Sequence, residues 1–433
     1  MEKDVRLSGF QTLKTLREAL EIIRKNITFK LPVEEIDIKD AYWRILAEDL
    51  ISPINIPPFT RSAVDGYAVK FEDVSSASEN SPVILDLVGE SITGQPFEGH
   101  VKSGEAVYVS TGAKIPAGAD TIIMVEYAKR QENKVEIYKS APPSYNFSIE
   151  GEDVKKGEII LEKGRILTPY DIALLGNIGI CKVKVRKRPI IGIILTGSEL
   201  VEPCQEGQQN LKEEGKIIDN LSLILIGLIN WFGFKYKHYG IVPDKENEIK
   251  KKLKEALSEC DFVITTGGTS VGKVDFIPNL VNELGEQGVL FHGVALQPGK
   301  PFSISVFGEK IVFSIPGFSV AAIFDFHEIV IPTIFHVLGS QYLPQPPHVD
   351  AILKRRVSKK LGIRNFVRVR LCKEDDAIYA EPFYSGGAGI LSSMVKTDGY
   401  FVVPEDTEGI EAGTKVRVFF FFPFVPRIQK CGE

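Results

Sequence analysis

Hydrophobic runs in the second half of the chain repeat one pattern three times. Each run is continuous enough for a buried strand, breaks at a turn that contains glycine, and gives way to a helical pattern. Near-continuous apolar strands that alternate with helices are typical of a parallel sheet covered on both faces. The three segments are Ile190 to Glu199, Phe262 to Gly272 and Ile311 to Ser319. Ligands of such sheets bind beyond the carboxyl ends of the strands, so we expect a binding site at these turns.

The turns themselves have the composition of anion sites. Backbone N–H groups in turns rich in Gly, Ser and Thr converge on an anion, and the N-terminus of the following helix adds to the attraction. The sequence therefore predicts that this part of the chain holds a phosphate-like group. The turn residues that we expect to contact it are Gly267, Gly268, Ser270, Gly272 and Gly317.

Periodicity elsewhere predicts smaller parts. Apolar residues at helical spacing predict an amphipathic helix over 11–27. Short alternating runs between about 51 and 150 predict a small β domain. In 155–187 a short strand precedes a helix that Thr168 and Pro169 begin. The remaining segments are an α/β block from about 188 to 338, a proline-rich linker at 342–347 and a second β domain after it.

Composition narrows the class of protein. A chain of 433 residues makes two to four domains. A net charge of −5 argues against a general nucleic-acid or membrane-surface binder. The five cysteines are scattered without a CxxC pair, which predicts neither a disulfide framework nor a zinc cluster and favours a reducing cytoplasm. We find no secretory signal and no apolar run that we expect to span a membrane.

Four carboxylates lie at positions where an acid could serve either a functional site or the local structure of a turn or helix end. Asp65 lies in a dense polar loop and is also explained by a turn with the following glycine. Glu199, Asp244 and Asp275 follow strands or open helices, and each is also explained as a helix cap or first-turn acid. Three acids at the junctions of one sheet are harder to explain in this way. Oxygen ligands beside phosphate-binding turns suit Mg²⁺, so these three residues are candidate metal ligands.

One further turn carries a cation between two apolar runs. It consists of Pro298, Gly299, Lys300 and Pro301. A hairpin turn with a solvated lysine and a clamp for an anion explain it equally well.

Several of these segments, and others along nearly the whole chain, resemble the MoeA family in order. This is the family of molybdopterin molybdenumtransferases, which includes the C-terminal domain of gephyrin. The segments are Pro57 to Val69, Thr111 to Ala113, Pro116 to Asp120, Gly151 to Asp153, Thr265 to Gly272, Val294 to Pro301 and Leu391 to Gly399.

The resemblance implies a multi-domain α/β plus β fold. The expected architecture is MoeA-like, elongated and of four domains, with a central MogA-like molybdopterin-binding α/β domain and two small β domains. The expected boundaries are a hinge and dimerisation domain at 1–51 plus 151–187, an inserted β domain at 52–150, the α/β domain at 188–338 and a C-terminal β domain at 339–433. The resemblance also implies a homodimer.

The reaction that the resemblance implies inserts molybdate or tungstate into adenylylated molybdopterin, releases AMP and depends on Mg²⁺. Its functional residues correspond here to Asp65, Thr111, Asp153, Glu199, Asp244 and Asp275. Within the family Asp65 and Thr111 of one subunit face the α/β domain of the other. The site would therefore lie at the dimer interface.

The chain departs from the family pattern at several anion-contacting positions. Gly293 and Gln297 stand where the family has two lysines, which would lower oxyanion affinity unless Lys300, Lys273 or Arg364 compensates. Phe318 and Ser319 replace an Asn-Pro pair. The other departures are Ser198, the segment Asp219 to Leu221, and Ala388 in place of a serine.

Three functions remain consistent with the sequence. The first is the metal-inserting transferase, to which the set of acids points. The second is a paralogue that binds molybdopterin or its nucleotide as a carrier and inserts metal poorly, which the missing lysines favour. The third is a dimeric scaffold, which needs no Mg²⁺ ligands. The sequence does not distinguish molybdate from tungstate, because the two oxyanions are nearly alike in size and charge.

Overall fold

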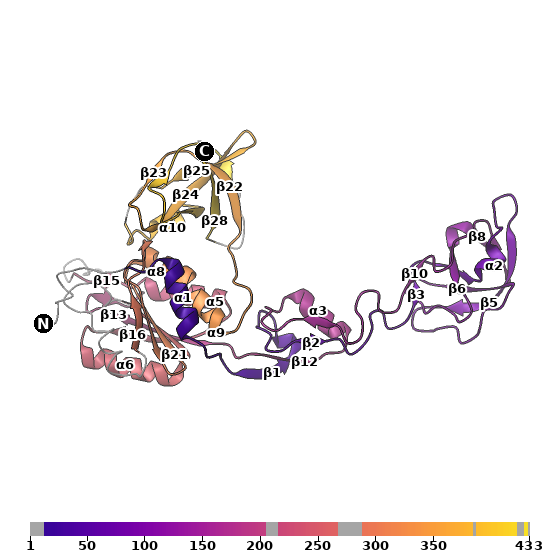
Figure 1. Cartoon of the computed structure of the whole chain (residues 1–433), viewed down its shortest axis with the longest axis horizontal. Helices are drawn as coiled ribbons and strands as arrows, with labels where there is room; N and C mark the ends of the chain where they lie inside the picture. The colour runs from indigo at the N-terminus through magenta and orange to yellow at the C-terminus, as the bar shows by residue number, and fades with distance from the viewer. Residues whose placement is uncertain (1–12, 205–214, 267–287, 384–386, 422–427, 432–433) are drawn as a thin grey trace.

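The computed structural model describes residues 13–204, 215–266, 288–383, 387–421 and 428–431. The molecule is elongated (Figure 1). An α/β part and the C-terminal β domain that is built on it form one end, and a small β domain forms the other. A thinner part made of two chain segments joins the two ends.

A six-stranded sheet in the order β16-β13-β17-β21-β20-β18 forms the centre of the α/β part. Strands β16, β13, β17 and β21 are parallel, as the apolar runs predict, whereas β20 and β18 run antiparallel to their neighbours. The three apolar runs are therefore confirmed as neighbouring parallel strands, and the sheet has in addition two antiparallel strands at one edge. Only two residues join β20 to β21, and so short a connection links antiparallel strands alone. The bounds are β13 (Ile190–Thr196), β16 (Lys235–Val242), β17 (Phe262–Thr266), β18 (Gly288–His292), β20 (Ser303–Phe307) and β21 (Lys310–Ile315).

Helices cover both faces of this sheet. Along β13, Ile193 and Leu195 join the core beneath α1, α5, α8 and α9, whereas Ile194 points to the opposite face and packs with α6. This alternation explains why the strand is apolar at every position. The helices are α1 (Leu16–Asn26), α5 (Leu221–Trp231), α6 (Glu246–Glu259), α8 (Ser319–Asp325), the π-helix η5 (Phe326–Val330) and α9 (Ile331–Val337).

The predicted N-terminal helix is confirmed as α1, which a capping box between Thr15 and Glu18 begins. Its apolar face packs on the α/β core, and a backbone bridge joins Lys14 to Val294. The first helix thus supports the end of the molecule that carries the sheet, far from its neighbours in sequence.

One apolar stretch, Ser319–Val337, has the length and composition to cross a membrane. The prediction that no apolar run in the chain reaches membrane-spanning length is therefore wrong for this stretch. Within the fold, however, 78% of the stretch is buried, as in the core helix of a globular protein.

The joining part consists of two small antiparallel pairs, one α-helix and one short 3-10 helix. The helix α3 (Pro169–Asn177) begins at the predicted Thr168, whose side chain forms a capping box with Asp171. The other elements are β1 (Val33–Asp37) paired with β12 (Lys182–Arg186), β2 (Leu50–Ile51) paired with β11 (Ile159–Leu161), and η2 (Ile38–Asp40).

A six-stranded sheet in the order β7-β4-β6-β5-β9-β8 forms the small β domain at the far end. Its elements are β3 (Arg61–Ser62), β4 (Gly66–Val69), α2 (Phe71–Val74), β5 (Val83–Ser91), β6 (Glu105–Val109), β7 (Thr121–Met124), η3 (Val125–Tyr127), β8 (Ala128–Gln131), β9 (Lys134–Ile137) and β10 (Phe147–Ser148).

The C-terminal β domain closes on itself, because β26 pairs with both β28 and β24. One strand, β19, comes from the α/β part and pairs with β24, so the two parts share a sheet. The elements are β19 (Leu296–Gln297), β22 (His348–Leu353), β23 (Val357–Ser358), β24 (Arg364–Glu374), β25 (Ala377–Pro382), α10 (Ser392–Val395), β26 (Gly399–Val403), β27 (Gly409–Ile410), β28 (Lys415–Phe420) and β29 (Gln429–Lys430).

A disulfide joins Cys372 to Cys431 in this domain. The prediction that the cysteines form no disulfide is wrong for this pair, although 59 residues separate them in sequence. Strand β29 pairs with β24 and brings the two thiols together, which no local spacing in the sequence reveals. The cysteines therefore no longer favour a reducing compartment.

Candidate functional site

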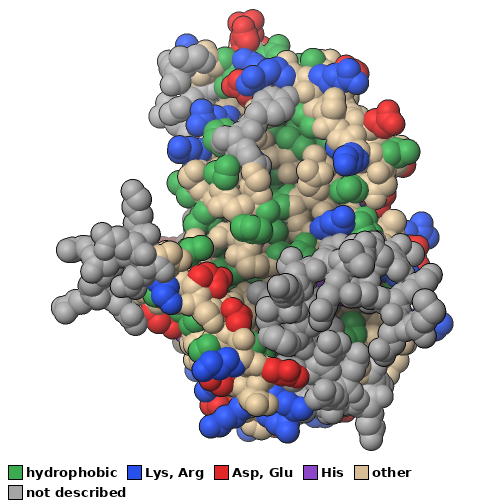
Figure 2. All heavy atoms as spheres, turned by 90° about the vertical axis from the view of Figure 1, so that its left-hand side faces the viewer, with side chains coloured by type: hydrophobic (Ala, Val, Ile, Leu, Met, Phe, Trp, Pro, Cys, Tyr) green, Lys and Arg blue, Asp and Glu red, His purple; other side chains and the backbone are tan. Residues whose placement is uncertain are grey.

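A pocket of about 420 Å³ lies beyond the carboxyl ends of β13, β17 and β21. This is the edge of the sheet at which the sequence predicts a site. Figure 2 shows the face of the molecule to which this edge belongs, with acidic and hydrophobic side chains between the grey segments. The pocket is lined by Thr196, Glu199, Leu200, Ile217, Ile218, Asp219, Asn220, Leu221, Thr266, Gly317, Phe318, Ser319 and Gly389.

Glu199 follows the first strand of the motif and lies back over its own turn. A Cβ atom on Gly197 would stand 2.7 Å from Glu199 Oε1, so a larger residue at this position would displace the carboxylate. A short strand, β14 (Leu200–Val201), comes next and pairs with β15 (Ile217–Ile218). The explanation of Glu199 as a first-turn helix acid is therefore wrong, because the element that the structure shows after this turn is a strand.

Asp244 is tied to the same turn. Its Oδ2 accepts a hydrogen bond from the Ser198 N–H at 3.0 Å, and its own N–H donates to Ser198 Oγ at 3.1 Å. The helix that follows, α6, has Lys245 at its N-cap and no side-chain cap. The prediction that Asp244 caps this helix is wrong, since the carboxylate turns toward the end of β13 instead. Two predicted acids, Glu199 and Asp244, thus belong to one site.

Two polar side chains position the helices at the pocket floor. Asp219 is buried and accepts hydrogen bonds from the N–H groups of Leu221 and Ser222 at 2.8 and 3.2 Å, so it caps the first turn of α5. Asn220 Oδ1 accepts a hydrogen bond from Ser319 Oγ at 2.5 Å. Ser319 is a departure from the family pattern that the sequence alone leaves unexplained. In the structure its hydroxyl links the start of α8 to the start of α5.

The turn from Pro298 to Pro301 lies in the connection between the antiparallel strands β18 and β20, so the hairpin alternative stays open. The strand before it, β19, pairs with β24 of the C-terminal domain, whereas β20 after it belongs to the central sheet. Lys300 is exposed on this turn. Of the residues expected to compensate for the missing lysines, Arg364 is paired with Glu405 at 3.3 Å, and Lys273 lies outside the described residues.

A buried acid that the sequence does not reveal lies behind this turn. A Cβ atom on Gly299 would stand 2.3 Å from Asp325 Oδ1. Neither carboxyl oxygen of Asp325 has a hydrogen-bond partner among the residues that the structure describes. Burial, together with the nearby Glu328, raises the pKa of Asp325 well above its ordinary value. Asp325 is spaced along its helix like a core residue. The sequence pattern alone, however, does not tell a buried acid from an exposed one.

The other predicted residues lie elsewhere in the chain. Asp65 and Thr111 form a pair in the small β domain: Asp65 Oδ1 accepts from the Thr111 N–H at 2.7 Å and from its hydroxyl at 3.1 Å. Asp153 lies where this domain meets the joining part, with its N–H bonded to the carbonyl oxygen of Ile56. Asp65 follows β3 and Thr111 follows β6, and Figure 1 shows both strands at a distance from the central sheet of the same chain.

Five predicted residues of the glycine-rich loop lie outside the described residues. They are Gly267, Gly268, Ser270, Gly272 and Asp275. Within the part of the chain that the structure describes, no three His, Cys, Asp or Glu side chains form a cluster able to hold a metal ion. Glu199 and Asp244 supply oxygen donors alone, which is the chemistry that Mg²⁺ prefers.

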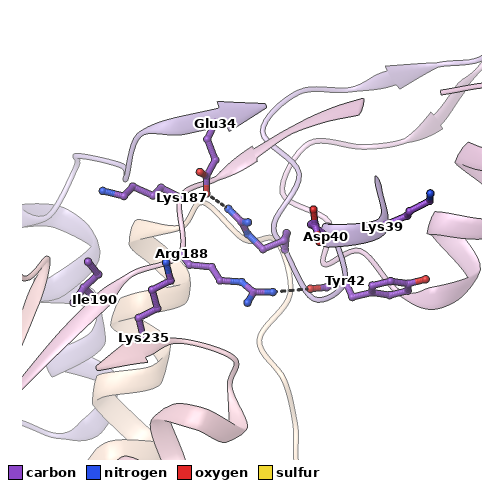
Figure 3. A pocket seen from close by; sticks show the side chains of 9 residues that line it. Glu34, Lys39, Asp40, Tyr42, Lys187, Arg188, Ile190 and Lys235 are labelled. Atoms are coloured by element: carbon purple, nitrogen blue, oxygen red, sulfur yellow. Dashed lines mark hydrogen bonds and ion pairs between the residues drawn. The ribbon is translucent and has the colours of Figure 1, made fainter. Parts of the chain in front are cut away.

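A second pocket, of about 430 Å³, lies at the opposite end of the sheet (Figure 3). We call it the basic cleft, defined by Glu34, Lys39, Asp40, Tyr42, Arg44, Lys187, Arg188, Ile190 and Lys235. Arg44 forms an ion pair with Glu34, and an Arg188 guanidinium nitrogen donates to the carbonyl oxygen of Tyr42. Burial, with Arg44 nearby, lowers the pKa of Arg188. None of the residues predicted for function lines this cleft.

Three family descriptions match the chain. They are the MoeA N-terminal region (domain I and II) over residues 14–179, a probable molybdopterin binding domain over 192–336, and the MoeA C-terminal region (domain IV) over 350–421.

Individual proteins match over nearly their whole length. A putative molybdopterin biosynthesis protein of Methanocaldococcus jannaschii is 39% identical, over 94% of this chain and 98% of that protein. The molybdopterin molybdenumtransferase of Haemophilus influenzae is 34% identical, over 93% and 98%. Among solved structures, the molybdopterin biosynthesis MoeA protein of Pyrococcus horikoshii superposes with a TM-score of 0.80 at 36% identity, over 95% of this chain and 100% of that one.

Proposed function

The chain belongs to the MoeA family of molybdopterin molybdenumtransferases, enzymes of molybdenum cofactor biosynthesis, and we propose that it inserts the metal of molybdate or tungstate into adenylylated molybdopterin with release of AMP. The fold is the expected MoeA-like arrangement with a central MogA-like α/β domain. The exact boundaries between its domains stay a prediction from the sequence.

The observation that carries the proposal is the pocket beyond the strand ends. Glu199, which the structure ties to Asp244 through Ser198, lies in it beside Gly317. Both acids lack an ion-pair partner among the described residues, so their charges remain available to a ligand. Asp244 also holds the Ser198 turn through its hydrogen bonds, but a carboxylate without an ion-pair partner can serve a cation or a proton in addition to the fold.

Mg²⁺ is the group that these donors fit, with Glu199 and Asp244 as ligands and Asp275 as the third by prediction. When bound, Mg²⁺ would offset negative charge on the phosphoanhydride as the bond to AMP breaks. The chain's own part is to fix the ligands. The two hydrogen bonds between Asp244 and Ser198 hold the ends of β16 and β13 together, and Gly197 admits the Glu199 carboxylate.

The turn from Pro298 to Pro301 is the proposed oxyanion contact, through Lys300 and the backbone of Gly299. The two nearby positions at which the family has lysines differ in whether their backbone would tolerate a lysine. Gly293 has φ of 89°, a left-handed conformation that favours glycine, so a lysine there would be strained. Gln297 is an exposed strand residue, and its backbone is free of this restriction.

Asp65 and Thr111 enter the proposal through a second subunit. Both belong to the small β domain, which lies at the opposite end of the elongated chain from the central sheet (Figure 1). A homodimer in which the small β domain of one subunit reaches the pocket of the other would bring all the predicted residues together. We also propose a cytoplasmic location, where other steps of cofactor assembly would supply the adenylylated substrate.

A single experiment tests the activity. Purified protein is incubated with adenylylated molybdopterin, with and without Mg²⁺ and with either molybdate or tungstate, and AMP is measured by chromatography. The proposal expects AMP only when both the cation and an oxyanion are present. AMP release that ignores the oxyanion would contradict metal insertion.

A carrier function is the second candidate, and the observation that favours it is the pair Gly293 and Gln297. Two charge-assisted contacts are absent from the oxyanion turn, each worth about 1.5–3 kcal/mol. A carrier would bind adenylylated molybdopterin tightly in the same assay and release no AMP.

A further inference from the structure

Phe318 is an aromatic side chain exposed at the mouth of the pocket. It is 63% exposed and lines the cavity beside Gly317. It sits at the N-cap of α8, where its side chain makes no capping hydrogen bond. A single exposed ring is common on protein surfaces, but this one lines the candidate pocket, where it offers a flat apolar surface to a ligand.

The C-terminal domain sets the position of this ring. A Cβ atom on Gly389 would stand 3.1 Å from Phe318 Cδ1, so the ring packs directly over the backbone of that glycine. The N–H of Val320 donates to the carbonyl oxygen of Ala388 at 3.1 Å and ties this loop to the start of α8. The ring is therefore held with one side against the loop and the rest open to the pocket.

A polar group held in place lines the same pocket. Asn220 Oδ1 is occupied by the Ser319 hydroxyl, and within the described part of the chain its amide nitrogen has no partner. Exposed amide hydrogens and a flat apolar surface are the two features that recognise a fused nitrogen heterocycle, through its polar edge and its face.

We propose that Phe318 stacks on a fused nitrogen heterocycle of the substrate and that Asn220, oriented by Ser319, donates to the edge of that ring. The inference rests on the proposed function, whose substrate contains two such rings, the pterin and the adenine. Phe318 and Ser319 are departures from the family pattern, so this would be a mode of ring recognition particular to chains that share them.

Ring binding can be measured without turnover. Free pterin is fluorescent, and stacking on an aromatic side chain should quench it, so a titration with the full-length protein gives Kd directly. Phe318→Leu keeps an apolar side chain but removes the flat surface, and should raise Kd about ten-fold. Phe318→Trp should restore or tighten binding. The matched control is Tyr170→Leu, since Tyr170 is exposed on α3, away from the pocket, and should leave Kd unchanged.

A second variant tests the position of the ring rather than its presence. Gly389 has an ordinary backbone conformation, and Gly389→Val would push the ring from its place by steric overlap. It should weaken pterin binding as Phe318→Leu does. Asn220→Ala and Ser319→Ala should each weaken it by a smaller factor, and the two losses should not add, because both remove the same oriented amide.

AMP forms the second arm and identifies which ring is stacked. It is titrated by calorimetry in a Lys235→Gln background, which reduces binding of its phosphate to the basic cleft. Weaker binding of pterin alone in Phe318→Leu assigns the pterin, and weaker binding of AMP alone assigns the adenine. Unchanged affinity for both rings in Phe318→Leu and in Gly389→Val would overturn the proposal.

The outcome is separable from that of the proposed function. If the wild-type protein releases no AMP from adenylylated molybdopterin yet binds pterin through Phe318, the transferase proposal fails and this one stands. If Phe318→Leu binds both rings like the wild type while AMP release persists, the proposal for Phe318 fails and the transferase proposal stands.

Discussion

The two ends of the central sheet carry opposite charge. The pocket at the carboxyl end contains Glu199 and Asp219 and is tied to Asp244, whereas the basic cleft at the amino end gathers Arg44, Arg188 and three lysines. The proposed substrates are anions, so charge alone would select the basic cleft. The family and the strand topology select the acidic pocket. A site that is acidic and yet receives phosphates needs a cation between protein and ligand.

The acids at the two ends also differ in what they contact. In the basic cleft Glu34 forms an ion pair with Arg44, so its charge stabilises the fold. At the carboxyl end Glu199 and Asp244 form no ion pair among the described residues. A carboxylate at a strand end that forms no ion pair is a candidate metal ligand, whereas a carboxylate in an ion pair is structural. This criterion distinguishes the two kinds of acid better than the net charge of the surrounding side chains does.

The largest expected effect tests this difference directly. Glu199→Gln and Asp244→Asn should each lower Mg²⁺-dependent AMP release by about 100-fold or more, since each removes a charged metal ligand. Asparagine at 244 keeps an acceptor for the Ser198 N–H, so folding should change little. Chromatographic AMP assays over a range of Mg²⁺ concentrations measure the effect.

The matched variants lie in the basic cleft. Lys187→Gln and Lys235→Gln each remove a charge of similar exposure and should leave AMP release within two-fold of wild type, since isolated surface charges contribute little. If these variants fail while those at Glu199 and Asp244 remain active, the assignment of the two ends is reversed.

The second prediction extends the comparison to the small β domain. If Asp65 acts across a dimer, Asp65→Asn and Glu199→Gln should each be inactive alone, yet mixed subunits should recover about a quarter of wild-type activity. The reason is that half of randomly mixed dimers are hybrids, and each hybrid keeps one intact site of two. Mixing after partial unfolding, followed by the AMP assay, measures the recovery.

A strictly monomeric protein with full activity would contradict this prediction. So would mixtures that stay inactive although light scattering shows that hybrid dimers have formed.

Much of this fold follows from local patterns. The strands β13, β17 and β21, the cap of α3 at Thr168 and the helix α6 all appear where apolar periodicity and capping residues predict them. The antiparallel direction of β18 and β20 does not follow from such patterns, because an apolar run alone does not fix the direction of a strand. Pairings over long sequence separations, such as β19 with β24 and Cys372 with Cys431, leave no local trace.

The candidate site shows the same division. Glu199 and Asp244 are found from their places after strands, but their connection through Ser198 requires the fold. The hydrogen bond between Ser319 and Asn220 joins two departures from the family pattern that the sequence presents separately. The sequence pattern does not reveal that Asp325 is buried, because only the folded structure distinguishes it from an exposed acid.

The third prediction concerns the cations absent from the carboxyl end. Gln297→Lys adds one charge beside the turn that carries Lys300 and should lower the molybdate concentration for half-maximal AMP release about ten-fold. In a carrier the same change should tighten molybdate binding without creating turnover. Gly293→Lys is the contrasting variant, because the φ of 89° at that position makes a side chain there costly to stability.

If Gln297→Lys changes neither molybdate binding nor turnover, the side chain at position 297 does not face the oxyanion. The case for Lys300 as the remaining contact would then weaken as well.

The smallest effect is expected from the buried acid behind the turn. Because burial raises the pKa of Asp325 in the folded state above that of the unfolded chain, its contribution to stability is fully present below about pH 4 and is lost as the pH rises toward the folded pKa. Asp325→Asn removes this titration. It should match the wild type near pH 4.5 and exceed it at pH 8 by on the order of 1 kcal/mol in the free energy of unfolding.

Urea unfolding followed by the fluorescence of Trp231, in a Trp43→Phe background, reports on the α/β part alone, since the chain has two tryptophans. The control is Asp406→Asn, an exposed acid that should show no such dependence on pH. Equal stability of Asp325→Asn and wild type at both pH values would mean that the pKa of the carboxyl is not raised in the folded state, or that a ligand at the turn compensates for its charge. Repeating the measurement with molybdate distinguishes the two, because only a compensating ligand makes the difference depend on its concentration.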